Sequence, residues 1–167
     1  MVAQAAVRVA AKSLAPAMDK LGMDKPWSGV IMERIVPAGG ASPRGHYSPA
    51  VHAGDFVYVS GQGPIDPATD KLAEGDVEFQ TRLTLSNIQR ILEAAGVGVT
   101  DVVKCSVFLR DIADFPKMNL VYAEFFGEHK PARTTVEAKF HQAEMLVEID
   151  CVAYKPHHEP TFSGVLD

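Results

Sequence analysis

The stretch that decides the fold is "PARTTVEAKFHQAEMLVEIDCVA", residues 131–153. Its pattern predicts two strands joined by a polar loop. Arg133 opens the first strand, and Glu148 interrupts the apolar run of the second strand between Val147 and Ile149. Because an exposed strand face carries charge at little cost, both could be ordinary surface residues. The alternative is that they line a cleft that needs one fixed cation and one carboxylate.

Two earlier strands are predicted in "YSPAVHAGDFVYVSGQ", residues 47–62, on either side of a turn at Gly54-Asp55. A further strand is predicted in "DVVKCSVFLR", residues 101–110. Its alternation places four apolar residues on one face: Val103, Cys105, Val107 and Leu109.

Two helices lie between these strands. Asp76 is expected to cap the first helix, which runs through Ala95 and is ended by Gly96. Asp114 is expected to cap the second helix, which has Pro116 in its first turn and ends at Gly127. The expected apolar stripes are Leu85, Ile88, Leu92 and Ala95 in the first helix, and Phe115, Met118, Tyr122 and Phe125 in the second.

The element order is therefore ββαβαββ, which predicts an α+β fold in which both helices pack on one face of a single-layer sheet. The other face is too apolar to be left in water, so we expect several sheets to associate in an oligomer. We divide the chain into an N-terminal extension (1–34), the folded domain (35–156) and a polar C-terminal tail (157–167). The extension is expected to be a short helix or a loosely ordered arm.

Composition narrows the function. A formal charge of −5 argues against a nucleic-acid surface, and no apolar run of about 18 residues exists to span a membrane. Cys105 and Cys151 are expected to be buried thiols of a cytoplasmic protein; a mitochondrial location would require the extension to be a transit peptide, which its few serines and arginines do not favour. The six histidines form no metal-ligand motif, and there is no phosphate-binding glycine motif or serine nucleophile elbow.

The last two strands are the remaining candidates for chemistry. If their turn centres on Gln142-Ala143, Arg133 and Glu148 share a face, and Glu148 lies opposite Glu137. Arg133 is then roughly 13 Å from Glu148, at about 3.3 Å per residue. This separation would exclude a direct salt bridge and leave room for a small ligand.

Four motifs in order resemble the reactive-intermediate deaminase family, RidA/YjgF: "YVSGQGPIDPATDKL", "NIQRILEAAGVGVTDVVKCSVFLRDIADFPKMNLVYAEFF", "PARTTVE" and "VEIDCVA". The resemblance runs from about Gly45 to Lys155. It implies a chorismate-mutase-like, YjgF-like α+β fold, a homotrimer, and clefts between subunits. It also implies hydrolysis of small enamine and imine acids, such as 2-aminoacrylate and 2-iminobutanoate, to 2-oxo acid and ammonia without a cofactor.

The resemblance also implies roles for particular residues. Arg133 would bind the substrate carboxylate, and Glu148 would position water and pass protons, with its pKa raised by partial burial between Val147 and Ile149. Backbone N–H groups at Gly61 and Thr135 would help to hold the substrate. The positions that match the family's other site motifs are Tyr47, Ser60-Gly61-Gln62 and Asn119.

Each position also has a structural interpretation. Tyr47 could pack at a strand start, Ser60-Gly61-Gln62 could be a strand exit, and Asn119 could bond a neighbouring loop. Two departures affect the substrate, because both could reshape a cleft. His141-Gln142 stands where the family usually has Leu-Pro, and the N-terminal arm is longer than the family's usual start. The alternative function is a non-catalytic trimeric module that binds small carboxylates or acts like a chaperone.

Overall fold

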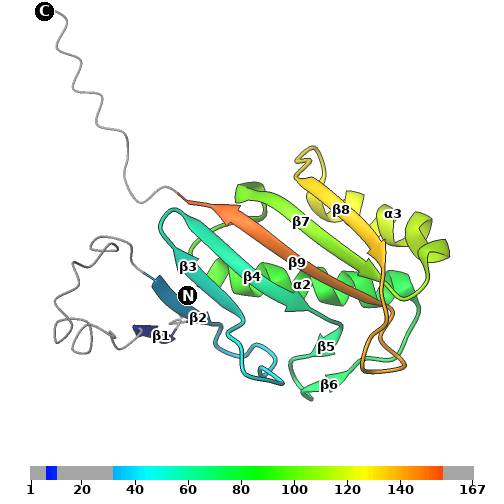
Figure 1. The fold of residues 1–167 in the computed structure, drawn as a ribbon, viewed down its shortest axis with the longest axis horizontal. Coiled ribbons are helices and arrows are strands. Elements are labelled where there is room, and N and C mark those ends of the chain that lie inside the picture. Colours follow the sequence, from blue (N-terminus) through cyan, green and yellow to red (C-terminus); the bar gives the residue numbers. More distant parts are fainter. Residues whose placement is uncertain (1–6, 11–31, 156–167) are drawn as a thin grey trace, which may run out of the picture.

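The computed structural model describes residues 7–10 and 32–155. A seven-stranded sheet in the order β1-β2-β3-β4-β9-β7-β8 carries helices α2 and α3 on one face (Figure 1). The strands are β1 (Val7–Ala10), β2 (Met32–Val36), β3 (Ala50–Ala53), β4 (Phe56–Gln62), β7 (Val102–Leu109), β8 (Ala132–Glu137) and β9 (Val147–Tyr154). The helices are α2 (Val77–Ala94) and α3 (Phe115–Phe126), and β5 (Ile65–Asp66) pairs with β6 (Lys71–Leu72) beside the sheet. The predicted α+β fold and its ββαβαββ order, from β3 to β9, are confirmed.

Strands β1 and β2 extend the sheet beyond this predicted set. β2 pairs antiparallel with β3, and β1 pairs antiparallel with β2. Neither strand was predicted from the sequence. The rest of the expected N-terminal helix or arm, and the C-terminal tail, lie outside the described residues. No helix of the described part of the chain is long and apolar enough to cross a membrane.

Most local predictions hold. Gly54 makes the β3–β4 turn with a φ of 60°, and the Asp76 carboxylate caps α2 by accepting from the Phe79 N–H at 2.8 Å. Asp114 precedes α3 but makes no side-chain capping bond; the carboxylate of Asp111 instead accepts from Ala113 N–H, in the short turn (Ile112–Asp114) before the helix. The stripe of α2 is buried as predicted, whereas α3 buries Met118, Val121, Tyr122 and Phe126, with Phe115 and Phe125 at the edge of the core.

The start of β7 corrects one prediction. Val102 is buried and Val103 is exposed, because the pairing with β9 shifts register between Val102 and Lys104. Such an irregularity reverses the alternation of the preceding residue, which the sequence pattern does not reveal. Beyond it, Cys105 lies opposite Cys151 in the core, and both thiols are free and buried, as expected.

The last two strands correct a larger prediction. β8 and β9 are not neighbours, because β7 lies between them: β7 pairs parallel with β8 and antiparallel with β9 (Figure 1). The polar loop at residues 138–146 therefore carries the chain past the end of β7 instead of closing a hairpin. Glu137 pairs with Leu109 and not with Glu148.

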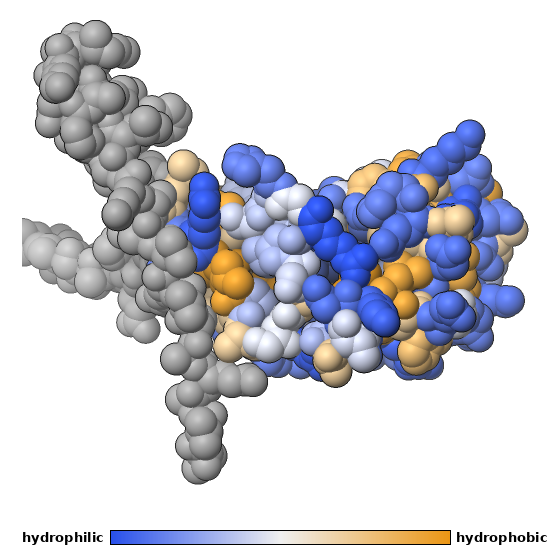
Figure 2. All heavy atoms as spheres, turned by 90° about the horizontal axis from the view of Figure 1, so that it is seen from below, coloured by the Kyte–Doolittle hydropathy of each residue, from blue (hydrophilic) through white to orange (hydrophobic). Residues whose placement is uncertain are grey.

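The sheet face opposite the helices carries aromatic side chains. Phe56, Tyr58 and Tyr154 are 38%, 49% and 43% exposed, and the ring of Phe56 lies 5.3 Å from that of Tyr154. Valines on the other side of β4 are buried against α2. Seen from below, at right angles to the view of Figure 1, another side of the molecule has small apolar areas between larger hydrophilic ones (Figure 2).

Lys155 joins the end of the sheet to the end of α2. Its Nζ donates to the carbonyl oxygens of Gly96 at 2.9 Å and Ala95 at 3.4 Å. These carbonyls lie at the C-terminus of the helix, where backbone acceptors lack helical partners and a cation complements the helix dipole. Gly96, with a φ of 73°, turns the chain there.

We therefore predict that Lys155→Met lowers the free energy of unfolding by about 0.5–1.5 kcal/mol, through the loss of charge-assisted hydrogen bonds and of the dipole interaction. Urea or thermal unfolding measures the change. Lys71→Met, at an exposed position in β6, is the matched control. Equal stability of the two variants would show that the Lys155 contacts contribute nothing.

Candidate functional site

A hollow of about 450 Å³ surrounds the Glu148 carboxylate on the sheet face opposite the helices. We call it the Glu148 hollow. Four of the predicted site residues line it: Tyr47, Ser60, Gly61 and Glu148. The other lining residues are Arg44, Gly63, Ile65, His141, Gln142 and Met145. Segments far apart in the sequence thus meet at one carboxylate.

Gly61 lets the carboxylate lie directly on the strand. It falls where the pairing of β4 with β9 shifts register, between Val59 and Gln62. A Cβ at position 61 would lie 2.9 Å from the carboxyl carbon of Glu148, and even nearer to Oε1. Any larger residue would displace the carboxylate, so Gly61 permits the observed position of the Glu148 side chain against β4.

The residues on either side of Gly61, at the irregularity of β4, are fixed by hydrogen bonds. The Ser60 hydroxyl donates to the Ser48 carbonyl at 2.7 Å, and Gln62 Nε2 donates to the Ser60 carbonyl at 3.0 Å. The Tyr47 hydroxyl accepts from the Arg44 N–H at 3.3 Å. These bonds hold the backbone of the hollow in place, which agrees with the structural interpretation of Ser60 and with a supporting role at the site.

The loop at residues 138–146 forms another wall and is held from the core. The fully buried amide of Gln80 donates to the Glu144 carbonyl at 2.9 Å and accepts from the Leu146 N–H at 2.8 Å. Arg110 donates to the carbonyls of Met145 at 2.7 Å and Gln142 at 2.6 Å. The loop therefore presents its side chains to the hollow from a fixed backbone.

The Glu148 side chain is half-buried, and its carboxylate makes no hydrogen bond or ion pair with the described residues. Burial raises the pKa of its carboxyl, the charge of His141 opposes that rise, and the negative charge of Asp150 adds to it. The predicted direction of the pKa shift is confirmed. Its cause differs from the prediction, because Val147 and Ile149 point to the helix face and the walls of the hollow bury the carboxyl.

A second hollow, of about 270 Å³, contains Arg133 and Asn119 on the helix side of the sheet edge. We call it the Arg133 hollow. The guanidinium carbon lies 4.5 Å from the ring centre of Tyr122 and 5.4 Å from that of Phe115. Both distances are within the range of cation–π attraction. Neither ring occupies the N–H donors of the Arg133 guanidinium, and no described residue accepts from them. These donors are therefore available to a ligand.

Thr135 lies two residues beyond Arg133 on β8 and lines neither hollow. Its hydroxyl is buried and has no hydrogen-bond partner among the described residues. The role suggested for this position uses the backbone N–H, which the side chain does not affect. Asn119 makes no hydrogen bond to a loop within the described chain, contrary to the structural interpretation.

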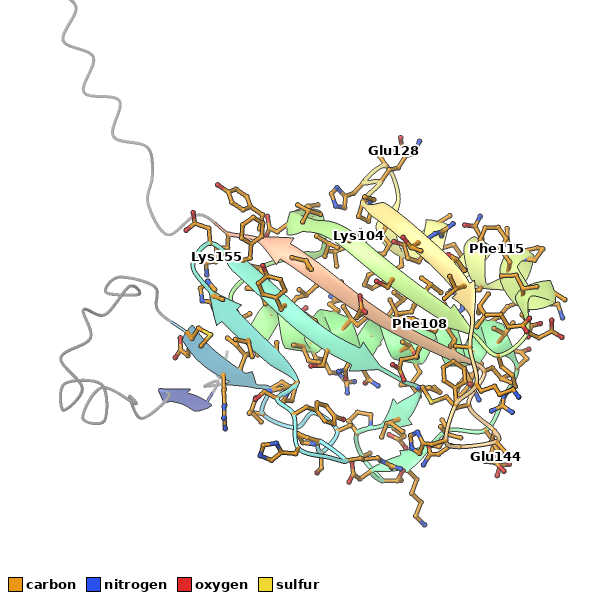
Figure 3. The ribbon with its side chains drawn as sticks, viewed as in Figure 1. Lys104, Phe108, Phe115, Glu128, Glu144 and Lys155 are labelled. Atoms are coloured by element: carbon orange, nitrogen blue, oxygen red, sulfur yellow. The ribbon has the colours of Figure 1, made fainter. Side chains whose placement is uncertain are left out.

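Within one chain, the structure does not bring Arg133 and Glu148 together. Arg133 pairs with Cys105, whose side chain is buried under the helices, whereas Glu148 pairs with Phe108 on the opposite face. The positions of Phe108 and Phe115 can be followed in Figure 3. The predicted shared face is therefore wrong, since the insertion of β7 reverses the relation between the two strands.

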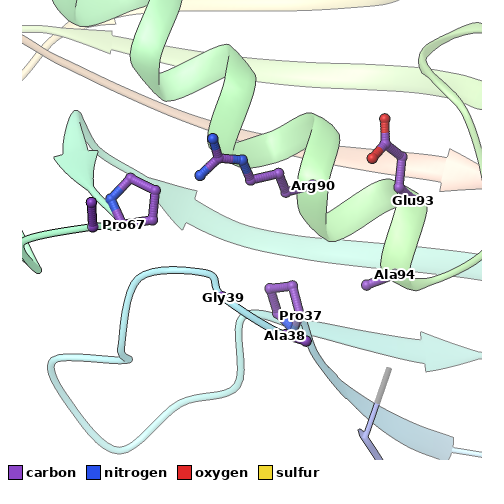
Figure 4. A pocket seen from close by; sticks show the side chains of 8 residues that line it. Pro37, Ala38, Gly39, Pro67, Arg90, Glu93 and Ala94 are labelled. Carbon is purple, nitrogen blue, oxygen red and sulfur yellow. The ribbon is translucent and has the colours of Figure 1, made fainter. Parts of the chain in front are cut away.

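A third hollow, of about 590 Å³, contains none of the predicted site residues. It lies between α2 and the loops at residues 37–39 and 67–68, with Arg90 and Glu93 on its helix wall (Figure 4). Within residues 7–10 and 32–155, no three histidine, cysteine, aspartate or glutamate side chains lie close enough together to bind a metal ion.

The fold and the two hollows define a class of α+β protein in which one sheet carries a carboxylate site on one face and a guanidinium site at its edge. Residues 39–155 match the family model described as Endoribonuclease L-PSP. The chain belongs to this family, which is the YjgF/RidA (Rid) family of the resemblance noted above.

Similar proteins include a RutC family protein of Pyrococcus horikoshii, 50% identical over 74% of this chain and 98% of that protein. The 3-aminoacrylate deaminase RutC of Acinetobacter baylyi is 43% identical over 73% of this chain and 97% of its own length. The 2-iminobutanoate/2-iminopropanoate deaminase of Salmonella typhimurium is 42% identical over 66% of this chain and 88% of its own length.

Solved structures agree. RidA from the Antarctic bacterium Psychrobacter is 39% identical and matches with a TM-score of 0.66 over 70% of this chain and 94% of that one. The YjgF gene product from E. coli is 37% identical and matches with a TM-score of 0.65 over 70% of this chain and 93% of that one. These similarities establish the family and its fold.

Several residues of the hollows were not predicted from the sequence. Arg44 and Met145 line the Glu148 hollow, and Phe115 and Tyr122 hold the guanidinium of Arg133. The aromatic pair was predicted only as a core stripe. Its spacing of seven residues, two helical turns, could have indicated a cation between the rings if the helix had been placed over β8.

We predict opposite pKa responses of Glu148 to two substitutions. His141→Leu removes the positive charge that lowers this pKa, so the pKa should rise. Asp150→Asn removes the negative charge that raises it, so the pKa should fall. An NMR titration of the Glu148 carboxyl carbon measures both pKa changes. Glu124→Gln, at an exposed position of α3, is the control. Shifts in the same direction would contradict this account of the hollow.

Proposed function

We propose that this protein is a hydrolytic deaminase of small enamine and imine acids, of the 2-aminoacrylate and 2-iminobutanoate type, that yields a 2-oxo acid and ammonia. One observation carries the proposal. Two half-buried side chains of opposite charge, Arg133 and Glu148, each lie in a hollow without a polar partner among the described residues. A buried charge without a partner is costly, and a ligand that pairs with it offsets the cost.

The two hollows would meet between subunits. The proposed assembly is a homotrimer in which the Arg133 edge of one subunit faces the Glu148 hollow of the next. The exposed aromatics Phe56, Tyr58 and Tyr154 support it, because they lie on the sheet face that the assembly would cover. Asn119 and the backbone at Thr135 would belong to the first half of each cleft, and Tyr47, Ser60 and Gly61 to the second.

In this cleft the Arg133 guanidinium binds the substrate carboxylate through two parallel hydrogen bonds. The rings of Phe115 and Tyr122 lie within cation–π distance of the guanidinium and hold it in place, so that the imine would be oriented as well as bound. The imine carbon then faces the Glu148 carboxylate across the cleft. The imine is already electrophilic and needs only a positioned water and proton transfer.

Glu148 provides the proton transfer. As a carboxylate it accepts a proton from the attacking water and passes it to the imine nitrogen, which gives a carbinolamine. It then accepts the proton of the carbinolamine hydroxyl and passes it to the amine, so that the C=O bond forms as the amine leaves. A raised pKa suits both steps, since it brings the group nearer to the working pH than an ordinary glutamate. The bond from carbon to nitrogen breaks and ammonia leaves, with no change of oxidation state and no cofactor.

The relatives support this function. Two relatives that match this chain over most of their own length are named deaminases. One is a deaminase of 3-aminoacrylate and the other of 2-iminobutanoate and 2-iminopropanoate. Both names describe small acids with a nitrogen that water can displace. The description of the family model as an endoribonuclease fits this chain less well, because a net charge of −5 does not favour RNA.

We predict that Arg133→Ala lowers kcat/KM by about 10- to 100-fold, the worth of a charge-assisted pair, and that Glu148→Gln lowers kcat by about 10²- to 10⁴-fold. The assay couples the protein to threonine dehydratase and follows 2-oxobutanoate release against a semicarbazide trap. Arg82→Ala, which breaks an exposed ion pair with Glu124, is the control.

Acceleration that survives both substitutions would reject the roles given to Arg133 and Glu148, whereas no acceleration by the wild-type protein would reject the deaminase. Tight binding of 2-oxobutanoate that depends on Arg133, without turnover in the wild-type protein, would instead support the alternative of a non-catalytic trimeric module.

Subunit mixing tests the position of the cleft. Arg133→Ala and Glu148→Gln subunits should each be nearly inactive alone. When equal amounts assort at random in a cyclic trimer, about one quarter of the clefts combine an intact Arg133 with an intact Glu148 from the next subunit. Refolding or co-expression should therefore recover about one quarter of wild-type activity.

Light scattering should give three times the chain mass of 18.0 kDa. Inactive mixed trimers, or a monomer at micromolar concentration, would contradict a cleft shared between subunits.

A further inference from the structure

Two cationic side chains of the Glu148 hollow have no role in the proposed hydrolysis. Arg44 and His141 line this hollow with Tyr47 and Glu148, and they come from loops more than ninety residues apart in the sequence. A site for an acid with a single carboxylate would need only Arg133. The additional groups call for a chemical explanation.

Arg44 is held in place. Its Nη2 donates to the carbonyl of Asp70, and its backbone N–H donates to the Tyr47 hydroxyl. Asp70 adopts a φ of 55°, and its carboxylate accepts from Ser42 N–H at 2.9 Å. Asp70 thus ties down the loop that carries Arg44, through its backbone and its side chain. Because a guanidinium has five N–H donors, most of those of Arg44 remain open to an anion.

His141 approaches the hollow from the loop at residues 138–146. The next residue, Gln142, is fixed through its carbonyl by Arg110. The imidazole makes no hydrogen bond with the described residues, and its positive charge acts on Glu148. His141 is thus a second cation or hydrogen-bond donor facing the space that a substrate would occupy.

The volume of the Glu148 hollow also exceeds what a three-carbon acid needs. A hollow of about 450 Å³ lies within the range of pockets that bury much larger ligands. Glu148 is the one carboxylate among its lining residues, which also include the guanidinium of Arg44 and the imidazole of His141. The arrangement favours an additional anionic group on the ligand, away from the end that Arg133 would hold.

We propose that the preferred substrates are short 2-iminodicarboxylates, whose distal carboxylate is bound by Arg44 and His141. This rests on the proposed function, because it assigns the α-carboxylate to Arg133 and the water to Glu148. The reaction stays balanced: water adds its oxygen to the imine carbon and a proton to nitrogen, and the carbinolamine then expels ammonia and leaves a 2-oxodicarboxylate. The distal carboxylate is unchanged.

The test compares two five-carbon imines that differ only in the distal carboxylate. They are generated from glutamate and norvaline with L-amino-acid oxidases in the presence of catalase, and hydrolysis is followed against a semicarbazide trap. The measured quantity is the ratio of kcat/KM for the dicarboxylate imine to that for the monocarboxylate imine. The ratio should exceed one in the wild-type protein.

Arg44→Met should lower that ratio by about 10- to 100-fold, because a charge-assisted pair is lost. His141→Leu should lower it by a smaller factor, and Arg44→Lys should retain part of it, since charge remains but the bidentate geometry does not. Arg90→Ala, on the separate hollow beside α2, is the control and should leave the ratio unchanged.

Binding of the products separates the two proposals. Calorimetry with 2-oxoglutarate and 2-oxopentanoate should show tighter binding of the dicarboxylate, lost in Arg44→Met. If neither imine is hydrolysed faster but this binding difference is found, the deaminase fails and the dicarboxylate site stands. If the monocarboxylate imine is turned over but Arg44→Met leaves the ratio and the binding difference unchanged, this inference is overturned and the deaminase stands.

Discussion

The position of β7 between β8 and β9 is the constraint on which the arrangement of charged groups depends. Each strand alternates its side chains between two faces, so the pairing partners of β7 fix where every residue of its neighbours points. Cys105 faces the helices, so its partner Arg133 lies on the helix side of the sheet. Phe108 faces away from the helices, so its partner Glu148 lies on the opposite side. One guanidinium and one carboxylate are thereby held on opposite sides of a single layer. The proposed cleft would therefore need two copies of the chain to bring the two groups together.

The carboxylate side is built mainly from backbone. Gly61 lies at an irregularity of β4 and admits the Glu148 carboxylate against the strand, while Gln80 and Arg110 fix the loop that faces it. The guanidinium side is built from rings, with Phe115 and Tyr122 of α3 on the Arg133 side chain. A carboxylate without a hydrogen-bond partner among the described residues and a cation held by π-faces both keep their hydrogen-bonding capacity for a ligand. This pre-organisation limits the entropy lost when a small substrate is bound.

Local signals in the sequence predicted the local structure well. The capping residue Asp76, the turn at Gly54 and the stripe of α2 each depend on a few neighbouring residues, and the structure has them as expected. Non-local pairing has no such signal. The pattern of residues 131–153 fits a hairpin as well as two strands separated by a third, and the shared face inferred for Arg133 and Glu148 failed for that reason. The burial of Val102 in place of Val103 has a similar cause, a register shift that only the partner strand defines. Arg133 and Glu148 stood out as charges in apolar strands, but Tyr47, Asn119 and the turn at Gly61 were found only through the family resemblance.

Arg133 alone does not distinguish an enzyme from a module that binds carboxylates, because a guanidinium between two rings would serve either purpose. Glu148 favours the proposed enzyme. A binding site for anions gains nothing from a carboxylate in its wall, since like charges repel and burial of the group costs free energy. The structure nevertheless places this carboxylate on a glycine, fixes the opposite loop from the core, and raises its pKa by burial. The Glu148 carboxylate thus lies where it opposes the binding of an anion, and its raised pKa favours proton exchange. A reaction in which a proton must be taken and returned explains both features.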